Sequence, residues 1–319
     1  MLERTAIGVD VGGTFTKLAL VGSQGRLLER AQMPTAPEAG PADFVRRVGA
    51  LVDAFKGRAG ARAIGLGLAG DVDSRRGCLR FTPNLPGWED FDFKKAFSRK
   101  MKRPVVVEND ANAAVWGAYV TELKRRPRNV IGVTLGTGVG GGLILEGRLY
   151  RGSTGSAGEI GHALVEPGGE LCHCGARGCL EAYAGNYGIV RTARRLLKKD
   201  PRRGALLRRL CPDLDALDPK TLTLAAERGD AVAREVWRLT GRRLGIGLAN
   251  LVLVLNPDVL LLLGGVSRAG RWLLDPVRRS LSDQPFQTSF KAASVRMAGN
   301  HDGGCVGAAL LALDGPGSR

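Results

Sequence analysis

The sequence predicts an α/β fold of two lobes, because one strand pattern occurs near the start of each half. The β-branched run Ala6–Val9 leads through a glycine turn into Leu18–Val21, which indicates a strand, a turn and a second strand. At an offset of 124 residues (Ile7 to Ile131), Ile131–Val133 leads through another glycine turn into Leu143–Leu145. This repeat predicts an internal duplication in which each lobe begins with a β-hairpin whose turn faces a shared cleft.

Two further observations support this fold class. Each half contains a later apolar strand that ends in glycine, Ile64–Gly70 in the first and Val259–Gly265 in the second. Helical periodicity fills the intervals, at Pro41–Phe55, Ala111–Lys124, Tyr187–Lys199, Ala231–Val254 and Val306–Leu313. Strands that alternate with helices predict largely parallel sheets. We expect a small lobe at 1–118 plus about 305–319, and a large lobe at 119–304.

Composition excludes several classes of protein. With 44% hydrophobic and 24% charged residues, the chain is neither disordered nor fibrous. No uninterrupted apolar run reaches the ~18 residues of a membrane span, and Glu3, Arg4 and Asp10 argue against a secretory signal. Clustered cysteines in a reducing compartment usually bind metal. These features predict a cytoplasmic protein with no membrane partner.

The net charge of +16 raises the question of a nucleic acid or polyanion partner. The basic residues occur in short dispersed groups, such as Lys124–Arg126 and Arg194–Arg195, on segments expected to be helical. Aromatic residues make up 5%, too few for a base-stacking platform. Solvated helix faces explain this charge, so we expect no nucleic acid partner.

The first glycine turn has the composition of a phosphate-binding loop. Gly12 and Gly13 allow backbone N–H groups to approach phosphate oxygens, Thr14 adds a hydroxyl and Lys17 a positive charge. Asp10 is a candidate for the hydrated Mg²⁺ that accompanies a nucleoside triphosphate. The alternative is a plain hairpin turn.

A second turn of the same kind, containing Thr137 and Gly138, favours the phosphate interpretation, since two such loops can clamp a triphosphate. The pattern is neither a Walker loop nor a dinucleotide-binding fingerprint. Gly264 and Gly265 follow a hydrophobic strand and would let an adenine lie near the backbone.

A carboxylate stands at the end of another short strand. Val105–Val107 leads into Glu108, Asn109 and Asp110, immediately before a predicted helix. Because ligands of α/β folds bind at such strand ends, Asp110 is a candidate general base, with Asn109 as a hydrogen-bond donor to a polyol. The alternative is that Asp110 caps the helix.

The segment 159–181 carries a metal-binding pattern. Cys172, Cys174 and Cys179 with His162 supply three thiols and one imidazole, the ligand set of a closed structural Zn²⁺ site. His173 is an alternative fourth ligand, and free thiols are the alternative to a metal. Cys78, Cys211 and Cys305 are isolated and are expected to be incidental.

Two acidic residues flank this loop. Glu159 and Glu181 could accept hydrogen bonds from vicinal sugar hydroxyls, and the alternative is that both are solvated surface acids.

These motifs together resemble the ROK family of sugar kinases and sugar-responsive repressors, in particular its bacterial glucokinases. The resemblance covers the whole chain and includes the Asp-x-Gly-Gly-Thr turn, Glu108–Asp110, Glu159–His162, the run Cys172–Glu181 and Asn256–Asp258. It implies a two-lobed actin-like ATPase (RNase H-like) fold with ATP, Mg²⁺ and a hexose in the cleft, and a homodimer.

The resemblance also implies residue roles. Asp110 would be the catalytic base, and His162, Cys172, Cys174 and Cys179 the zinc ligands. The sugar hydroxyls would be bound by Asn84, Asn109, Glu159, His162 and Glu181. The expected reaction transfers the γ-phosphoryl group of ATP to the 6-hydroxyl of glucose.

Three alternatives remain open at this point. The acceptor could be N-acetylglucosamine, N-acetylmannosamine, mannose or fructose, and polyphosphate could replace ATP as the donor. The protein could also be a sugar-sensing repressor, although the nucleotide turn begins at Asp10 and leaves no room before it for a DNA-binding domain.

Overall fold

The computed structural model describes residues 3–200, 202–299 and 303–315. Two compact units are present: unit 1 comprises the described residues of Met1–Arg128, Gly142–Gly158 and Gly299–Arg319, and unit 2 those of Asn129–Gly141 and Glu159–Ala298. The predicted large lobe, 119–304, has different bounds from unit 2. The predicted division into lobes stays a prediction.

Unit 1 is built on a mixed sheet in the order β3-β2-β1-β4-β7. Its strands are β1 (Thr5–Val11), β2 (Phe15–Gly22), β3 (Leu27–Pro34), β4 (Ala61–Leu68) and β7 (Val105–Asn109). β1, β4 and β7 run parallel to one another, while β2 and β3 are antiparallel additions. A separate hairpin pairs β5 (Asp71–Asp73) with β6 (Cys78–Phe81).

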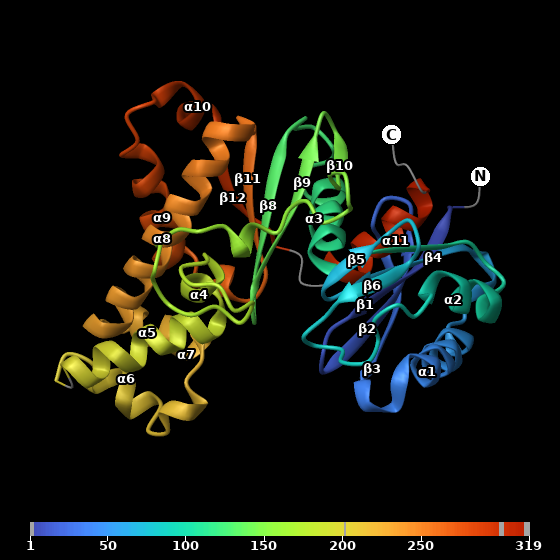
Figure 1. The fold of residues 1–319 in the computed structure, drawn as a ribbon, viewed down its shortest axis with the longest axis horizontal. Coiled ribbons are helices and arrows are strands. Elements are labelled where there is room, and N and C mark those ends of the chain that lie inside the picture. The colour runs from blue at the N-terminus through green and yellow to red at the C-terminus, as the bar shows by residue number, and fades with distance from the viewer. Residues whose placement is uncertain (1–2, 201, 300–302, 316–319) are drawn as a thin grey trace. The chain divides into compact units, whose positions relative to one another are not determined.

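Helices cover both faces of this sheet. They are α1 (Gly40–Ala54), α2 (Phe93–Met101), α3 (Asp110–Thr121) and α11 (Gly303–Asp314). One face packs Ile7, Val9 and Leu66 with aromatic side chains of α1 and α2, among them Phe44 and Phe97. Figure 1 shows α1 and α2 on one side of the sheet and α11 on the other.

The other face of the sheet is flat because it carries glycine. Gly8 on β1 pairs with Gly65 on β4, and both lie directly against the α11 backbone. A Cβ atom on Gly8 would lie 1.7 Å from the carbonyl oxygen of Cys305, and one on Gly65 would lie 1.8 Å from that of Ala308. The absence of side chains at these two positions is therefore what allows α11 to reach the sheet.

Gly65→Ala is expected to destabilise unit 1 by about 1–3 kcal/mol, because the added methyl group forces α11 away from the sheet. Gly299→Ala is the matched control, since nothing lies within 4 Å of a Cβ atom there. Thermal unfolding followed by circular dichroism compares the two variants with the wild type. Equal midpoints for both would contradict the packing argument.

The second sheet repeats the strand order of the first. Its order is β10-β9-β8-β11-β12, with β8 (Val130–Leu135), β9 (Val139–Leu145), β10 (Arg148–Tyr150), β11 (Val259–Leu263) and β12 (Ser294–Met297). β8, β11 and β12 are parallel, as β1, β4 and β7 are. The boundary between the two units falls within β9. The predicted duplication is thereby confirmed at the level of topology.

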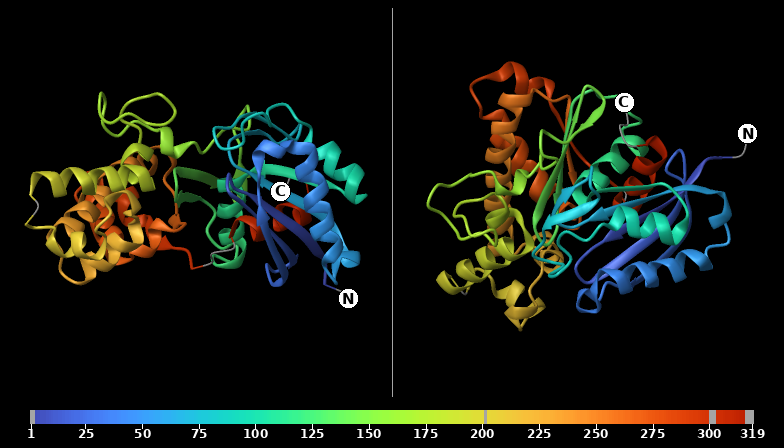
Figure 2. Two further views of the ribbon diagram at one scale, coloured as in Figure 1. Left: turned by 90° about the horizontal axis from the view of Figure 1, so that it is seen from below. Right: turned by 45° about the vertical axis from the view of Figure 1, so that its right-hand side comes forward.

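The remaining helices belong to unit 2. They are α4 (Glu181–Ala184), α5 (Asn186–Lys199), α6 (Ala205–Leu210), α7 (Pro219–Glu227), α8 (Ala231–Leu255), α9 (Arg271–Ser282) and α10 (Gln287–Ala292). The loop before α4, yellow-green in Figure 2, is long and almost without regular structure. In the described part of the chain, no helix combines the length and apolarity that crossing a bilayer requires.

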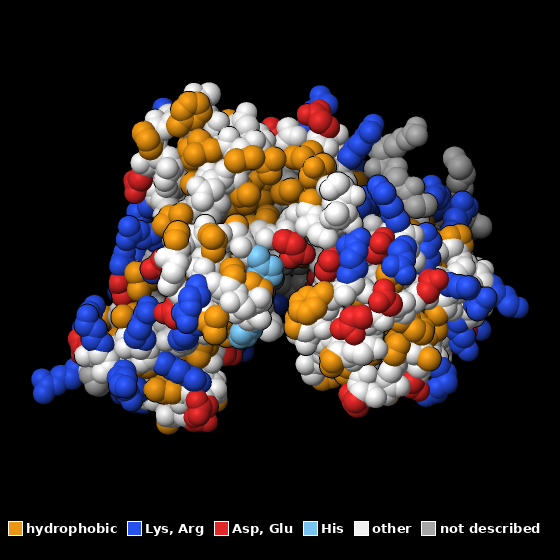
Figure 3. Space-filling view, in the orientation of Figure 1, with side chains coloured by type: hydrophobic (Ala, Val, Ile, Leu, Met, Phe, Trp, Pro, Cys, Tyr) orange, Lys and Arg blue, Asp and Glu red, His pale blue; other side chains and the backbone are white. Residues whose placement is uncertain are grey.

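Basic side chains are scattered over the face of the molecule that Figure 3 shows. On α5, Arg194 pairs with Asp215 at 2.9 Å, and Arg195 pairs with Glu170 at 2.9 Å. The prediction that Lys124–Arg126 is helical is wrong, because α3 ends at Thr121 and Arg125 has φ of +54°. Arg125 instead lies over the Trp116 ring and pairs with Asp314 at 2.8 Å.

Candidate active site and metal cluster

The carboxyl ends of β1, β4 and β7 bring several predicted site residues to one edge of the first sheet. Asp10 pairs in register with Gly67, and Gly67 pairs with Glu108. The Asp10 carboxylate also lies against Gly304 in the first turn of α11. Because the three strands are parallel, Asp10, Asn109 and Asp110 share the edge at which α/β folds bind ligands.

The first glycine turn lies at the same edge and is held by a residue that the sequence did not single out. Thr35 Oγ1 donates to the carbonyl oxygen of Gly12 at 2.6 Å, and the Thr35 backbone N–H donates to that of Thr14 at 2.9 Å. Asn84 packs against this turn, since a Cβ atom on Gly13 would lie 3.2 Å from Asn84 Cβ. Asn84, a predicted sugar ligand, therefore lies beside the predicted phosphate-binding turn.

The first turn of α3 settles which residue caps that helix. Asn109, not Asp110, is the N-cap, because Asn109 Oδ1 accepts from the Asn112 backbone N–H at 3.0 Å. Asn109 Nδ2 donates to the carbonyl oxygen of Gly70 at 3.0 Å. Asp110 is the first helical residue, and its Oδ1 accepts from the Ala111 backbone N–H at 2.9 Å. Asp110 is half-buried. Because Asn109 caps α3, the helix does not need Asp110 as its N-cap.

In unit 2 the second glycine turn meets Glu181. The Gly136 backbone N–H donates to the carbonyl oxygen of Gly138 at 3.0 Å, which closes the turn. Glu181 Oε2 accepts from the Val139 backbone N–H at 3.0 Å, and its carboxylate lies against Gly138. Thr137, at the tip of the turn, is exposed.

Gly264 and Gly265 lie beside this turn in the second sheet. They follow β11, and a Cβ atom on Gly264 would lie 2.4 Å from the carbonyl oxygen of Leu135, the last residue of β8. Both glycines are exposed. The two predicted nucleotide-binding segments of unit 2 therefore lie at the carboxyl ends of neighbouring parallel strands.

The predicted metal ligands come together in unit 2. One ligand atom each from His162, Cys172, Cys174 and Cys179 lies within 4.8 Å of every other. Cys174 Sγ and Cys179 Sγ are 3.7 Å apart, and Cys172 Sγ is 3.8 Å from His162 Nδ1. Two sulfurs bound tetrahedrally to zinc at about 2.3 Å lie about 3.8 Å apart, so the donor set and its spacing fit Zn²⁺.

The chain path explains how three cysteines reach one point. The Cys172 backbone N–H donates to the carbonyl oxygen of Ala176 at 2.8 Å, which folds the loop back on itself. Gly178 has φ of +89°, and a Cβ atom there would lie 1.9 Å from the carbonyl oxygen of Glu166. Burial, together with the neighbouring thiols, raises the pKa of the Cys179 thiol to about 12. Three thiolates would therefore need a cation at this place.

The alternative metal ligand, His173, has a different position. Its ring stacks on that of Tyr187, with centroids 3.9 Å apart and an interplanar angle of 18°. Cys78, Cys211 and Cys305, expected to be incidental, lie buried outside the cluster.

Tyr187 is a residue that sequence reasoning missed. Its hydroxyl lies 3.6 Å from Cys172 Sγ and 3.4 Å from Glu181 Oε1. Glu181 is thus connected to both the second glycine turn and the cysteine cluster. Glu159, by contrast, is exposed, and its backbone carbonyl accepts from the His162 N–H at 3.1 Å.

The site candidates form two groups, one in each unit. Unit 1 holds Asp10, Gly12, Gly13, Thr14, Lys17, Asn84, Asn109 and Asp110. Unit 2 holds Thr137, Gly138, Glu159, His162, Cys172, Cys174, Cys179, Glu181, Gly264 and Gly265.

A duplicated α/β fold with two glycine turns and a Cys₃His cluster defines the class of the protein. The model of the ROK family matches residues 6–315, nearly the whole chain. The chain belongs to the ROK family, which confirms the resemblance and the predicted fold.

The chain is similar to several sugar kinases over nearly its whole length. A glucokinase of Streptomyces coelicolor is 38% identical over 97% of both chains, and an N-acetylmannosamine kinase of Escherichia coli is 31% identical over 97% of this chain and 98% of that relative. The structure of a ROK family glucokinase from Streptomyces griseus, in complex with glucose and AMPPNP, is 37% identical with a TM-score of 0.83. The matched region covers 98% of this chain and 100% of the Streptomyces griseus chain. The chain is therefore a ROK-family protein of the sugar-kinase type.

Proposed function

We propose that the protein is an ATP-dependent glucokinase that phosphorylates the 6-hydroxyl of glucose. The observation that carries this proposal is the position of Asp110, a half-buried carboxylate at the same sheet edge as Asp10 and the Gly12–Thr14 turn. A base and a phosphate-binding turn at one edge are what phosphoryl transfer to a hydroxyl requires. The glucokinase relatives, at 37–38% identity, support glucose as the acceptor.

In this proposal Asp110 accepts the proton of the sugar 6-hydroxyl while that oxygen attacks the γ-phosphorus of ATP. The bond from the γ-phosphorus to the bridging oxygen breaks, and ADP leaves with its electron pair. Backbone N–H groups of the first turn, together with Lys17, stabilise the negative charge on the transferred group. Mg²⁺ bound with ATP would neutralise phosphate charge, and Asp10 would hold its hydration shell.

The other candidates bind rather than react. The sugar hydroxyls are assigned to Asn84, Asn109, Glu159, His162 and Glu181. The nucleotide is assigned to Asp10, Gly12, Gly13, Thr14, Lys17, Thr137, Gly138, Gly264 and Gly265. His162, Cys172, Cys174 and Cys179 would hold Zn²⁺, which braces the loop and leaves no coordination position for a reacting water. A homodimer stays a prediction.

The first experiment measures ADP release with Mg²⁺-ATP and each of glucose, mannose, fructose, N-acetylglucosamine and N-acetylmannosamine. We expect the highest kcat/KM with glucose. The N-acetylmannosamine kinase relative, at 31% identity, makes an acetamido sugar the second candidate, and preference for one would keep the mechanism and change the substrate. Turnover with polyphosphate instead of ATP would change the donor. If the folded protein phosphorylates none of these sugars with either donor, the proposal is overturned.

A further inference from the structure

Glu108 is an acidic side chain buried beside the candidate base. It is 2% exposed, and Asp230 is the other acidic residue of the described chain that is buried to this degree. Asp230 is explained as the N-cap of α8, because its Oδ1 accepts from the Ala233 backbone N–H. Glu108 caps no helix. Burying a carboxylate is costly unless its hydrogen-bond partners are well placed, so the partners of Glu108 indicate what it does.

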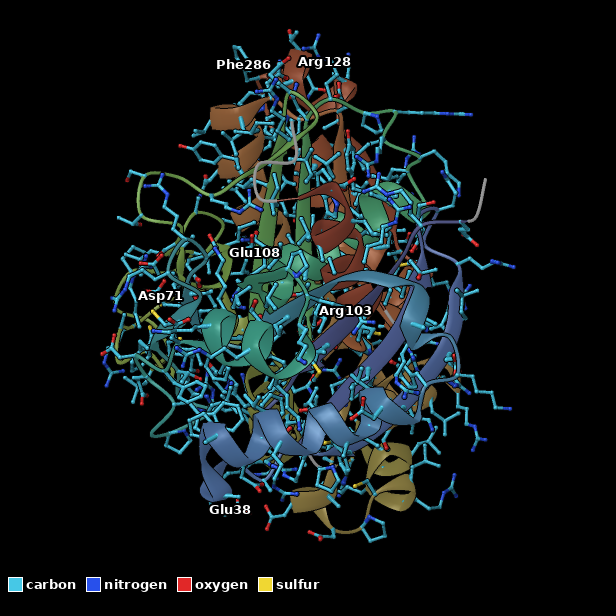
Figure 4. All side chains as sticks on the ribbon, turned by 90° about the vertical axis from the view of Figure 1, so that its right-hand side faces the viewer. Glu38, Asp71, Arg103, Glu108, Arg128 and Phe286 are labelled. Atoms are coloured by element: carbon cyan, nitrogen blue, oxygen red, sulfur yellow. The ribbon has the colours of Figure 1, made fainter. Side chains whose placement is uncertain are left out.

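Both carboxylate oxygens of Glu108 are engaged. Oε2 accepts from Arg151 Nε at 2.6 Å, a charge-assisted hydrogen bond of short length. Oε1 accepts from the Asn109 backbone N–H at 3.0 Å and from Asn112 Nδ2 at 3.1 Å. Figure 4 labels Glu108, which lies in the interior beside α3. These contacts reach the residues on either side of Asp110 in the first turn of α3.

Arg151 reaches Glu108 from a distant part of the chain within unit 1. It follows β10 and begins the segment 151–158, which is also attached to the β5–β6 hairpin. In that attachment Arg80 Nη2 donates to the carbonyl oxygen of Thr154 at 2.5 Å, and Ser156 Oγ donates to Asp71 Oδ1 at 2.6 Å. Arg151 is thus anchored and presents a fixed guanidinium group to the end of β7.

The pair is weak evidence for a contribution to stability. Buried ion pairs can often be replaced by apolar residues without loss of stability. Glu108, which Arg151 holds, contacts both Asn109 and Asn112. Asn109 caps α3 by accepting from the Asn112 backbone N–H. Any shift of Glu108 would therefore move the turn that carries Asp110.

We propose that Glu108 and Arg151 are positioning residues that fix the first turn of α3 and thereby aim the Asp110 carboxylate. This inference rests on the proposed function, in which Asp110 is the base. Neither residue touches the reacting atoms. Their contribution is the orientation of Asp110, and misplacement of a catalytic group by about 1 Å can cost about 10²-fold in rate.

The experiment compares Arg151→Ala, Arg151→Lys and Glu108→Gln with Glu146→Gln, a control that removes the charge from an exposed ion pair with Arg128 in the same unit. We expect Arg151→Ala to lower kcat for glucose by about 10–100-fold, with KM for ATP changed by less than about threefold. Arg151→Lys should recover part of this loss, and Glu146→Gln should behave as the wild type.

A double-mutant cycle separates positioning from stability. In an Asp110→Asn background, Arg151→Ala should cause little further loss of turnover, because the residue it positions is already disabled. An equal fold-loss in both backgrounds would show a merely structural role and overturn the inference. So would a lower unfolding midpoint with kcat unchanged.

Glu108→Gln keeps the shape of the side chain and serves if Arg151→Ala does not fold. An unchanged kcat in folded Glu108→Gln would also overturn the inference. Wild-type protein that phosphorylates no sugar would overturn the proposed function first, so the two failures are distinguishable.

Discussion

Asp110→Asn is expected to lower the kcat of glucose phosphorylation by at least about 10²-fold while glucose binding is mostly retained. The amide keeps the shape of the side chain but cannot accept the proton of the 6-hydroxyl. The helix should be undisturbed, because its N-cap is Asn109 and not Asp110. Steady-state kinetics and calorimetric titration with glucose measure the two effects separately.

The matched control for this variant is Asp92→Asn. Asp92 is the N-cap of α2 in the same unit, and its Oδ1 accepts from the Lys95 backbone N–H at 2.8 Å. Its amide variant should be as active as the wild type. Turnover of Asp110→Asn within about threefold of the wild type would remove Asp110 from the role of base.

Cys179→Ser is expected to lose the bound metal and nearly all activity. The segment 163–180 contains almost no regular structure, and its own apolar cluster is small: Cys172, Cys179, Ala182 and Tyr183, with Val165 packed against them. A structural zinc contributes about 10–16 kcal/mol in small metal-dependent domains, far more than such a cluster supplies. Without it we expect His162 and Glu181 to lose their fixed positions.

Metal analysis and hydrogen exchange test this expectation together. The wild type should contain about one zinc ion per chain and show slow exchange across 163–180, whereas Cys179→Ser should show neither. Cys211→Ser, at a buried cysteine outside the cluster, should keep the metal. A folded wild type that binds no zinc, or a Cys179→Ser protein that retains it, would contradict the assignment.

Much of the fold could be predicted because its central strands are short apolar runs that end in glycine. The strands at the sheet edges could not, since β3 is largely exposed and β12 ends in exposed residues, so neither shows a clear pattern of burial. The helix predicted to reach Lys124 ends at Thr121, and two successive residues beyond its end, Lys124 and Arg125, adopt positive φ. No propensity of lysine or arginine indicates such a turn.

Some residues of the candidate site could likewise be predicted from the sequence, and others could not. Close spacing along the chain identified the cysteine cluster, and a strand followed by a carboxylate identified Asp110. Thr35, Arg151 and Tyr187 were missed because each meets its partner through tertiary contacts. Arg151, for example, lies 43 positions after Glu108 in the sequence. Polar residues at such separations carry no local signal, and only the fold brings them together.

The glycine face of the first sheet has a consequence for the order in which the protein folds during synthesis. α11, which covers Gly8 and Gly65, follows all of unit 2 along the chain. A ribosome therefore completes unit 2 before the helix that covers Gly8 and Gly65 has been made. Domains usually finish folding in the order of their synthesis, but here the part made first has to wait for residues 303–314. A nascent chain stalled before this helix would expose the sheet at Gly8 and Gly65 to chaperones.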